Sequence, residues 1–267
     1  MAIIIDGKSE DLPSITSRSF VDDPTLELRP QDCRARTGWV RSVVLHTTKG
    51  IPGGQIRIPQ KILPGLGVAV GAGKRTSSCW ANDGRAGGAH LVVDFDGAVT
   101  CHADLQTTAA YHAGAANQVS IGIEIYQGAG GELYEGQLEV VVALVDWLTR
   151  RFGIQRQTPA AYAGAPIDRL EAGGRDFVGV FGHRDCSGNR GAGDPGDEIF
   201  RMLWVAGYEA FDLEAEADMA VWKGRQTDLG LAPADGVPGP RTLAALLAAG
   251  RPAGMWVRRP GDAPAVA

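Results

Sequence analysis

Two histidines follow short apolar runs and precede polar residues, a placement that suits metal ligands. His46 closes the run VVLH, and His183 closes VGVFGH. If these runs are neighbouring strands, both imidazoles emerge at one edge of the sheet, where binding sites of open α/β sheets typically form. Asp194 lies across a glycine-rich turn from His183 and would complete a set of three ligands. Three protein ligands plus one water is the pattern of catalytic zinc.

Spacing alone leaves other interpretations open. A histidine at the end of a strand is more often a hydrogen-bonded surface or core residue, and Asp-Pro-Gly is a common start of a helix. Cys186 is a rival ligand, because His183-x-x-Cys186 has metal-ligand spacing. Thiolate ligands of structural sites usually come in pairs, however, and the sequence offers no partner cysteine.

The elements that must position these residues are predicted strands and helices. Short apolar, β-prone runs predict strands at residues 39–48, 89–101 (two strands), 119–126 and 176–182. Asp96-Gly97 divides the second of these runs and is a strong hairpin signal. Apolar residues recur at helical spacing from Glu135 to Phe152, and Arg150 and Arg151 complement the end of this helix.

Strands that alternate with helices predict an α/β fold with a central mixed β-sheet flanked by helices. Another helix is expected after Asp194, with Pro195 at an early position. We expect an irregular N-terminal arm at residues 1–37, a catalytic domain at 38–206, and a small helical module with a tail at 207–267. Residues 50–87 are rich in glycine and proline and predict a long surface loop.

Composition limits the kinds of partner. The chain has 267 residues and a formal net charge of -5, which argues against a nucleic-acid binder. No apolar run is long enough to cross a bilayer, and the N-terminus lacks the pattern of a secretory signal. We therefore expect synthesis in the cytoplasm, no membrane insertion, and four scattered cysteines that stay reduced.

Five blocks in order carry a family resemblance: VVLHTT, AHLVVDFDGAVT, YHAGAANQVSIGIEI, GHRD and DPGDEIF. From Trp39 to Leu203, the sequence resembles the zinc-dependent N-acetylmuramoyl-L-alanine amidases of the amidase-2 class, which share a fold with peptidoglycan recognition proteins. The resemblance implies Zn²⁺ held by His46, His183 and Asp194.

The resemblance also implies a catalytic carboxylate that acts as a base. Glu124, in SIGIEI, matches the residue that activates the zinc-bound water in one branch of the family. The other branch uses a tyrosine where this chain has Ala89. Zinc would lower the pKa of its water and polarise the amide carbonyl, while the Glu124 carboxylate accepts the proton.

One position departs from the family pattern. Family members often carry a lysine two residues before the last ligand, where it can stabilise the oxyanion, and this chain has Ala192 there. Arg190 is a candidate to replace that cation, and a solvated loop residue is the equal alternative. The departure puts catalytic efficiency in question rather than zinc binding.

The remaining candidates concern the substrate cleft. His112 and Asn117 match the family's HAG…N pattern and are predicted to bind the junction of lactyl group and peptide, although His112 could instead hold its loop. Trp80, in the long loop, is a candidate for stacking on a sugar. We expect His90 to be structural and His102 to be a surface residue at a strand end.

The C-terminal segment resembles part of a peptidoglycan-binding module. The matching residues are Gln226, Leu229, Gly230, Asp235, Gly236, Gly239 and Thr242. Packing of a helical hairpin on the catalytic domain is the structural alternative.

Together these features predict an enzyme that cleaves the amide bond between the lactyl group of N-acetylmuramic acid and L-alanine, in the manner of an endolysin. Two alternatives are a peptidoglycan-binding protein on this fold that has lost catalysis, and a cytoplasmic amidase that recycles anhydro-muropeptides. Action at the cell wall or periplasm would require export, for which lysis through a holin and delivery by a secretion machine both fit.

Overall fold

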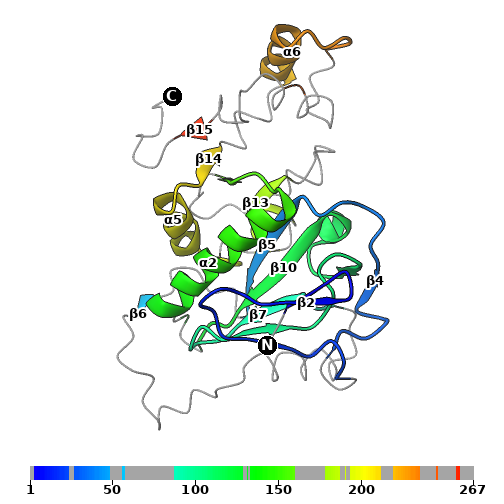
Figure 1. Ribbon diagram of the computed structural model, residues 1–267. Coiled ribbons are helices and arrows are strands. Elements are labelled where there is room, and N and C mark those ends of the chain that lie inside the picture. Colours follow the sequence, from blue (N-terminus) through cyan, green and yellow to red (C-terminus); the bar gives the residue numbers. More distant parts are fainter. Residues whose placement is uncertain are drawn as a thin grey trace.

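A computed structural model describes residues 3–23, 27–48, 56–57, 87–128, 131, 133–159, 178–186, 190, 193–211, 219–234, 245 and 257–258. Its centre is a six-stranded sheet with the order β13-β5-β10-β7-β8-β3 (Figure 1). In chain order, these strands are β3 (Ser17–Ser19), β5 (Ser42–Thr47), β7 (Leu91–Val93), β8 (Val99–Cys101), β10 (Ser120–Ile125) and β13 (Gly179–Gly182). The pairs from β13 to β7 are parallel and the β7–β8 pair is antiparallel, so the predicted mixed sheet is confirmed.

The helix predicted from the apolar periodicity is confirmed as α2 (Glu135–Phe152). It crosses one face of the sheet beside α5 (Asp197–Val205) (Figure 1). α2 ends at Gly153, whose φ of 64° lies in the left-handed region that glycine adopts without strain. Under α2, the apolar side chains of β5 and β10 form the main core with Leu138, Val141, Val145 and Leu148.

The first 37 residues are not the irregular arm that we predicted. β1 (Ile3–Ile5) pairs with β2 (Lys8–Glu10), β3 extends the main sheet, and β4 (Cys33–Ala35) pairs with β9 (Thr108–Ala110). Strands of three residues are too short to show an alternating pattern, and the partners of β3 and β4 lie far along the chain. Both end residues of β1 are buried in the main core.

The chain beyond residue 206 begins by packing on the preceding domain. Tyr208 is buried, and its hydroxyl lies 3.1 Å from Thr149 Oγ1 of α2. β14 (Glu209–Phe211) pairs with β12 (Gln157–Pro159) and with β15 (Val257–Arg258). The predicted boundary at 206/207 therefore falls inside a packed region.

Further along, α6 (Met219–Asp228) is described, whereas residues 235–256 of the expected helical module lie outside the described residues apart from Ala245. The C-terminal module therefore stays a prediction. The shorter elements are β6 (Ile56–Arg57), which pairs with β11 (Leu133–Tyr134), the 3-10 helix η1 (Gly114–Gln118), and α4 (His183–Cys186).

Two local predictions were wrong. His102 is not a surface residue: it is buried, with Nε2 2.8 Å from Thr100 Oγ1 and its ring centroid 5.4 Å from that of Phe20. Pro195 does not lie in the helix, since α5 begins at Asp197. Within the described ranges, no helix combines the length and apolar character that a membrane span requires.

A single carboxylate ties the N-terminal hairpin to the sheet. Asp104, in the loop after β8, accepts hydrogen bonds from the backbone N–H groups of Asp6 (3.1 Å) and Gly7 (2.7 Å) in the β1–β2 turn. The N–H groups of Gln106 and Thr107 donate to the same side chain. Burial acts to raise the pKa of Asp104, but these four donors together hold it below its usual value.

Asp104→Asn is expected to destabilise the protein by about 1–3 kcal/mol at neutral pH, because an amide replaces a charged acceptor of four N–H groups. The folded pKa lies below that of the unfolded chain, so this contribution is present at neutral pH and is lost as the pH falls through the folded pKa. Urea unfolding at pH 7 and in acid measures the difference. Asp22→Asn is the control for removing an exposed charge from the same N-terminal segment, and an equal loss for both variants would contradict the role of Asp104.

Candidate metal centre

Alternation along β5 decides which sheet face carries the first candidate ligand. Val43 and Leu45 point into the core under α2, whereas Val44 belongs to a cluster on the opposite face. His46, two residues after Val44, points to that opposite face as well. The sequence VVLH therefore places an apolar side chain and an imidazole together on the side away from α2.

The second histidine arrives on the neighbouring strand. β13 pairs in parallel with β5, and its last residue, Gly182, lies opposite Leu45. The chain then turns into α4 at His183, and Gly182 N–H donates to Asp185 Oδ2 at 2.7 Å. A Cβ on Gly182 would lie 2.8 Å from Pro195 Cδ, so glycine lets the segment that carries Asp194 approach.

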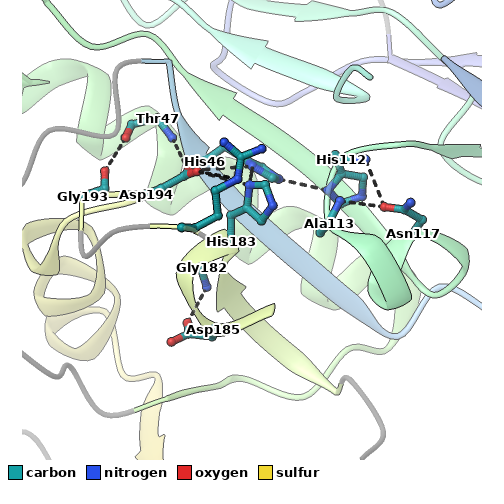
Figure 2. Close-up of polar contacts among 11 residues, drawn as sticks. His46, Thr47, His112, Ala113, Asn117, Gly182, His183, Asp185, Gly193 and Asp194 are labelled. Atoms are coloured by element: carbon teal, nitrogen blue, oxygen red, sulfur yellow. Dashed lines mark hydrogen bonds and ion pairs between the residues drawn. The ribbon is translucent and has the colours of Figure 1, made fainter. Parts of the chain in front are cut away.

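The structure brings His46, His183 and Asp194 together, with one ligand atom from each residue within 4.8 Å of the others (Figure 2). The Nδ1 atoms of the two histidines are 2.9 Å apart. Asp194 Oδ2 lies 3.2 Å from His183 Nδ1, and Asp194 Oδ1 lies 3.9 Å from His46 Nδ1. Ligand atoms around one tetrahedral zinc are separated by roughly 3.3 Å, so this set fits a metal ion.

Backbone contacts hold the carboxylate in this position. Thr47 N–H donates to Asp194 Oδ1 at 3.1 Å, and Thr47 Oγ1 donates to the Gly193 carbonyl at 2.6 Å (Figure 2). On the other side, Arg184 N–H donates to the Asp194 carbonyl at 2.8 Å. Sequence reasoning missed Thr47, although its place directly after His46 was a signal that it would lie at the same sheet edge.

The environment of His46 disfavours protonation of its ring and so suits a metal ligand. Burial lowers the pKa of His46 far below its usual value, and the nearby His183, His112, Arg190 and His90 lower it further. His46 is therefore a neutral imidazole with a lone pair on one ring nitrogen, which is the form that binds a metal ion. Two imidazole nitrogens with a carboxylate oxygen is a known ligand set of catalytic zinc.

The rival ligand Cys186 has a different environment. Its side chain is buried in the apolar cluster with Val44, Phe181 and Ala113. Among the described residues, the group that could hold a metal contains His46, His183 and Asp194.

Glu124 lies beside this group. It is paired with His46 in the parallel register of β10 and β5, and the isoleucines on either side of it point into the core under α2. Burial raises the pKa of Glu124 to about 8; the Asp194 charge raises it as well, and Arg190 opposes them. Some of the side chain remains accessible, so solvent or substrate can reach it. A carboxyl with a raised pKa beside a metal group suits proton transfer.

Arg190 reaches the edge of the group. Its Nε lies 4.0 Å from Asp194 Oδ2, and its side chain is about half exposed. Ala192, where the family lysine would stand, and Trp80 lie outside the described residues.

His112 and Asn117 make contacts within the protein beside the metal group. His112 Nδ1 lies 3.0 Å from His46 Nε2, on the side of that ring away from His183 (Figure 2). Asn117 Oδ1 accepts the backbone N–H groups of His112 and Ala113 at 3.0 and 2.7 Å, so it holds the start of η1. Burial, followed by His90, His183 and Arg36, lowers the pKa of His112 far below its usual value, and only a hydrogen bond to the Ser120 backbone opposes them.

The structural role expected for His90 agrees with its contacts. Its ring is buried, its Nδ1 accepts Gly122 N–H at 2.9 Å, and its Nε2 lies 3.0 Å from the Thr108 carbonyl. It is not among the atoms that converge on the metal group.

Comparison with protein families agrees with this geometry. The family model described as N-acetylmuramoyl-L-alanine amidase matches residues 36–197, which is more than half of the chain and includes every residue of the group. The chain therefore belongs to the N-acetylmuramoyl-L-alanine amidase family. No curated protein sequence matches it significantly.

Solved structures with a similar fold are distant. The ectodomain complex of peptidoglycan recognition proteins LCa and LCx bound to tracheal cytotoxin matches with 16% identity and a TM-score of 0.45, over 73% of this chain and 98% of that one. The endolysin LysCS from Clostridium intestinale URNW has 14% identity and a TM-score of 0.41, over 72% and 97%. AmpD has 18% identity and a TM-score of 0.39, over 72% and 95%.

In the metal-free protein, Glu124 is expected to titrate near pH 8 instead of near 4.5. Asp194→Asn should lower this midpoint by removing a negative neighbour, and Arg190→Gln should raise it by removing a positive one. Carbon-13 NMR of the Glu124 carboxyl measures both shifts. A midpoint near the ordinary glutamate value, or shifts of the opposite sign, would contradict this electrostatic description.

Proposed function

We propose that this chain is a zinc-dependent peptidoglycan amidase that hydrolyses the bond between the lactyl group of N-acetylmuramic acid and L-alanine of the stem peptide. The observation that carries this proposal is the register of β10 and β5, which puts Glu124 next to a group of three converging metal-ligand atoms. Both features lie within the region that matches the amidase family.

In this mechanism, His46, His183 and Asp194 would hold the metal ion. Zn²⁺ bound there would act as a Lewis acid toward the amide carbonyl and make a water molecule acidic enough to attack at neutral pH. The chain's own contribution is a fixed ligand set, in which Thr47 orients the Asp194 carboxylate and the neighbouring strands orient the two imidazoles.

Glu124 handles the proton. Its carboxylate accepts a proton from the attacking water and then returns it to the departing amine of L-alanine, so that the lactyl carboxylate and a free amino group are the products. The pKa of about 8 in the metal-free site favours the protonated form at neutral pH. Beside a bound metal ion, the Glu124 carboxylate would be favoured over the protonated form, as a general base requires.

Arg190 is the candidate for the missing lysine. Its guanidinium lies beside Asp194, from where a half-exposed side chain can swing toward a developing oxyanion. In this proposal, Trp80 stacks on a sugar ring, and His112 and Asn117 contribute to the substrate cleft by holding its wall rather than by hydrogen bonds from the His112 ring to the substrate. The C-terminal segment around Gln226 would bind the cell wall.

The place where the enzyme acts is also part of the proposal. The enzyme acts on the wall or in the periplasm in the manner of an endolysin, and it reaches its substrate through a holin or a secretion machine. A tether to the wall raises the local concentration of the substrate, which a recycling amidase for soluble muropeptides would not need.

The purified protein is expected to bind about one zinc ion per chain, and His46→Ala or His183→Ala should abolish this binding. Asp194→Ala should weaken it strongly, because the third ligand is lost. Cys186→Ser is the matched control and should retain the metal. Elemental analysis with a chelator competition measures each case. Zinc loss in Cys186→Ser together with retention in Asp194→Ala would overturn the ligand assignment.

Glu124→Gln is expected to reduce turnover by roughly 10²–10⁴-fold, because the amide keeps the shape but cannot take up a proton. Zinc content and thermal stability should stay near those of the unmodified protein. Mass spectrometry of products from purified sacculi measures cleavage and identifies the bond. Unchanged turnover in this variant would reject Glu124 as the base. A zinc-loaded chain that releases no product would instead indicate a recognition protein without catalysis.

A further inference from the structure

A chain of hydrogen bonds leads from a backbone carbonyl to the far side of His46. Ser120 Oγ lies 2.6 Å from the Ala116 carbonyl and 3.2 Å from His112 Nε2. A carbonyl oxygen can only accept, so the single hydroxyl proton of Ser120 is donated to Ala116. Ser120 therefore offers a lone pair to His112, and Nε2 of His112 must carry the proton of that contact.

The next contact follows from the first. A neutral imidazole with its proton on Nε2 presents a lone pair at Nδ1. His112 Nδ1 lies 3.0 Å from His46 Nε2, which must then be the donor. With its proton on Nε2, His46 has a bare lone pair at Nδ1, the atom that faces His183 and Asp194 (Figure 2).

Packing around the His112 ring fixes it where Nδ1 can accept the hydrogen bond from His46 Nε2. A Cβ on Gly122 would lie 2.7 Å from its Cγ and Nδ1, so only a glycine on β10 leaves room for the ring. The ring meets His46 edge-on, with centroids 5.2 Å apart and an interplanar angle of 73°. Asn117 holds the backbone at residues 112 and 113.

We propose that His112 is a positioning residue that sets the tautomer and orientation of His46, so that the relay from Ala116 through Ser120 and His112 leaves Nδ1 of His46 free for the metal. Both ring nitrogens of His112 are used within the protein, which leaves no ring donor or acceptor for the substrate. Partners that hold the second nitrogen of a ligand histidine commonly strengthen metal binding. This inference rests on the proposed function in that the ligand group takes up zinc.

The first test needs no variant and no metal. Long-range nitrogen-15 NMR of the metal-free, full-length protein distinguishes the two tautomers of each histidine. The proton is expected on Nε2 of both His46 and His112. A proton on Nδ1 of His46 would overturn the relay whether or not the protein binds zinc, so this result is independent of the proposed function.

The second test measures zinc affinity by chelator competition, with the zinc ion alone as the probe. His112→Phe, which keeps a ring but loses both nitrogens, should weaken zinc binding about 10- to 100-fold. His112→Gln should restore much of the loss, because its carbonyl oxygen can accept from His46 Nε2. Gly122→Ala should also weaken binding, because the new methyl group displaces the ring.

His102→Phe is the matched control, since it removes another buried imidazole that lies outside the relay. It should bind zinc as the unmodified protein does. Zinc affinity in His112→Phe equal to that in His102→Phe would overturn the proposal. Failure of the unmodified protein to bind zinc would reject the proposed function instead, and the tautomer measurement would still decide the relay.

Discussion

The parallel pairing of β5 with β10 is the constraint on which the rest of the site depends. Six residues of each strand are paired in register, from Ser120 with Ser42 to Ile125 with Thr47. Paired residues of neighbouring parallel strands point to the same face, so this register puts Glu124 beside His46. A slip by one residue would move the carboxyl under α2 and bring the β10 isoleucines to the site. Burial of those isoleucines therefore holds Glu124 beside His46.

The face opposite α2 concentrates neutral imidazoles. His90, His112 and His46 lie in succession, with ring centroids 5.2–5.5 Å apart. Burial, and then the positive charge of Arg36, lowers the pKa of His90 to about 3, although the Thr108 carbonyl and Asp104 oppose this. Uncharged imidazoles keep a lone pair on one ring nitrogen, and together with the Asp194 carboxylate they offer donor atoms for a cation. This agrees with the proposed zinc ion.

The N-terminal segment contacts the sheet face that carries the site through Arg36. Arg36, which follows β4, donates from Nη1 to the Gln118 carbonyl at 2.9 Å and from Nη2 to the Ser120 carbonyl at 2.9 Å. These contacts fix the point where η1 leads into β10. Ser120, the first residue of β10, is the residue that contacts His112 in the relay. The strands at residues 3–35 precede the segment that matches the family model. These strands add β3 to the main sheet and pair β4 with β9, and Ile3 and Ile5 of β1 join the main core.

The sequence by itself determined the features that depend on local pattern. Apolar periodicity located α2 at Glu135–Phe152, and short apolar runs located the strands that end near His46 and His183. The order of the blocks identified the amidase family and its mixed sheet. Local pattern could not reveal β3 and β4 of the N-terminal segment, because each has three residues and pairs with a strand far along the chain.

Only the tertiary structure decided how the polar residues of the site share their hydrogen bonds. Asn117 accepts hydrogen bonds from the backbone at the start of η1, Thr47 donates to Asp194, and the His112 ring contacts that of His46. Each of these contacts joins atoms whose separation depends on strand register and loop course. The residue type determines whether a side chain can donate or accept a hydrogen bond, whereas the packed fold determines which partner it meets.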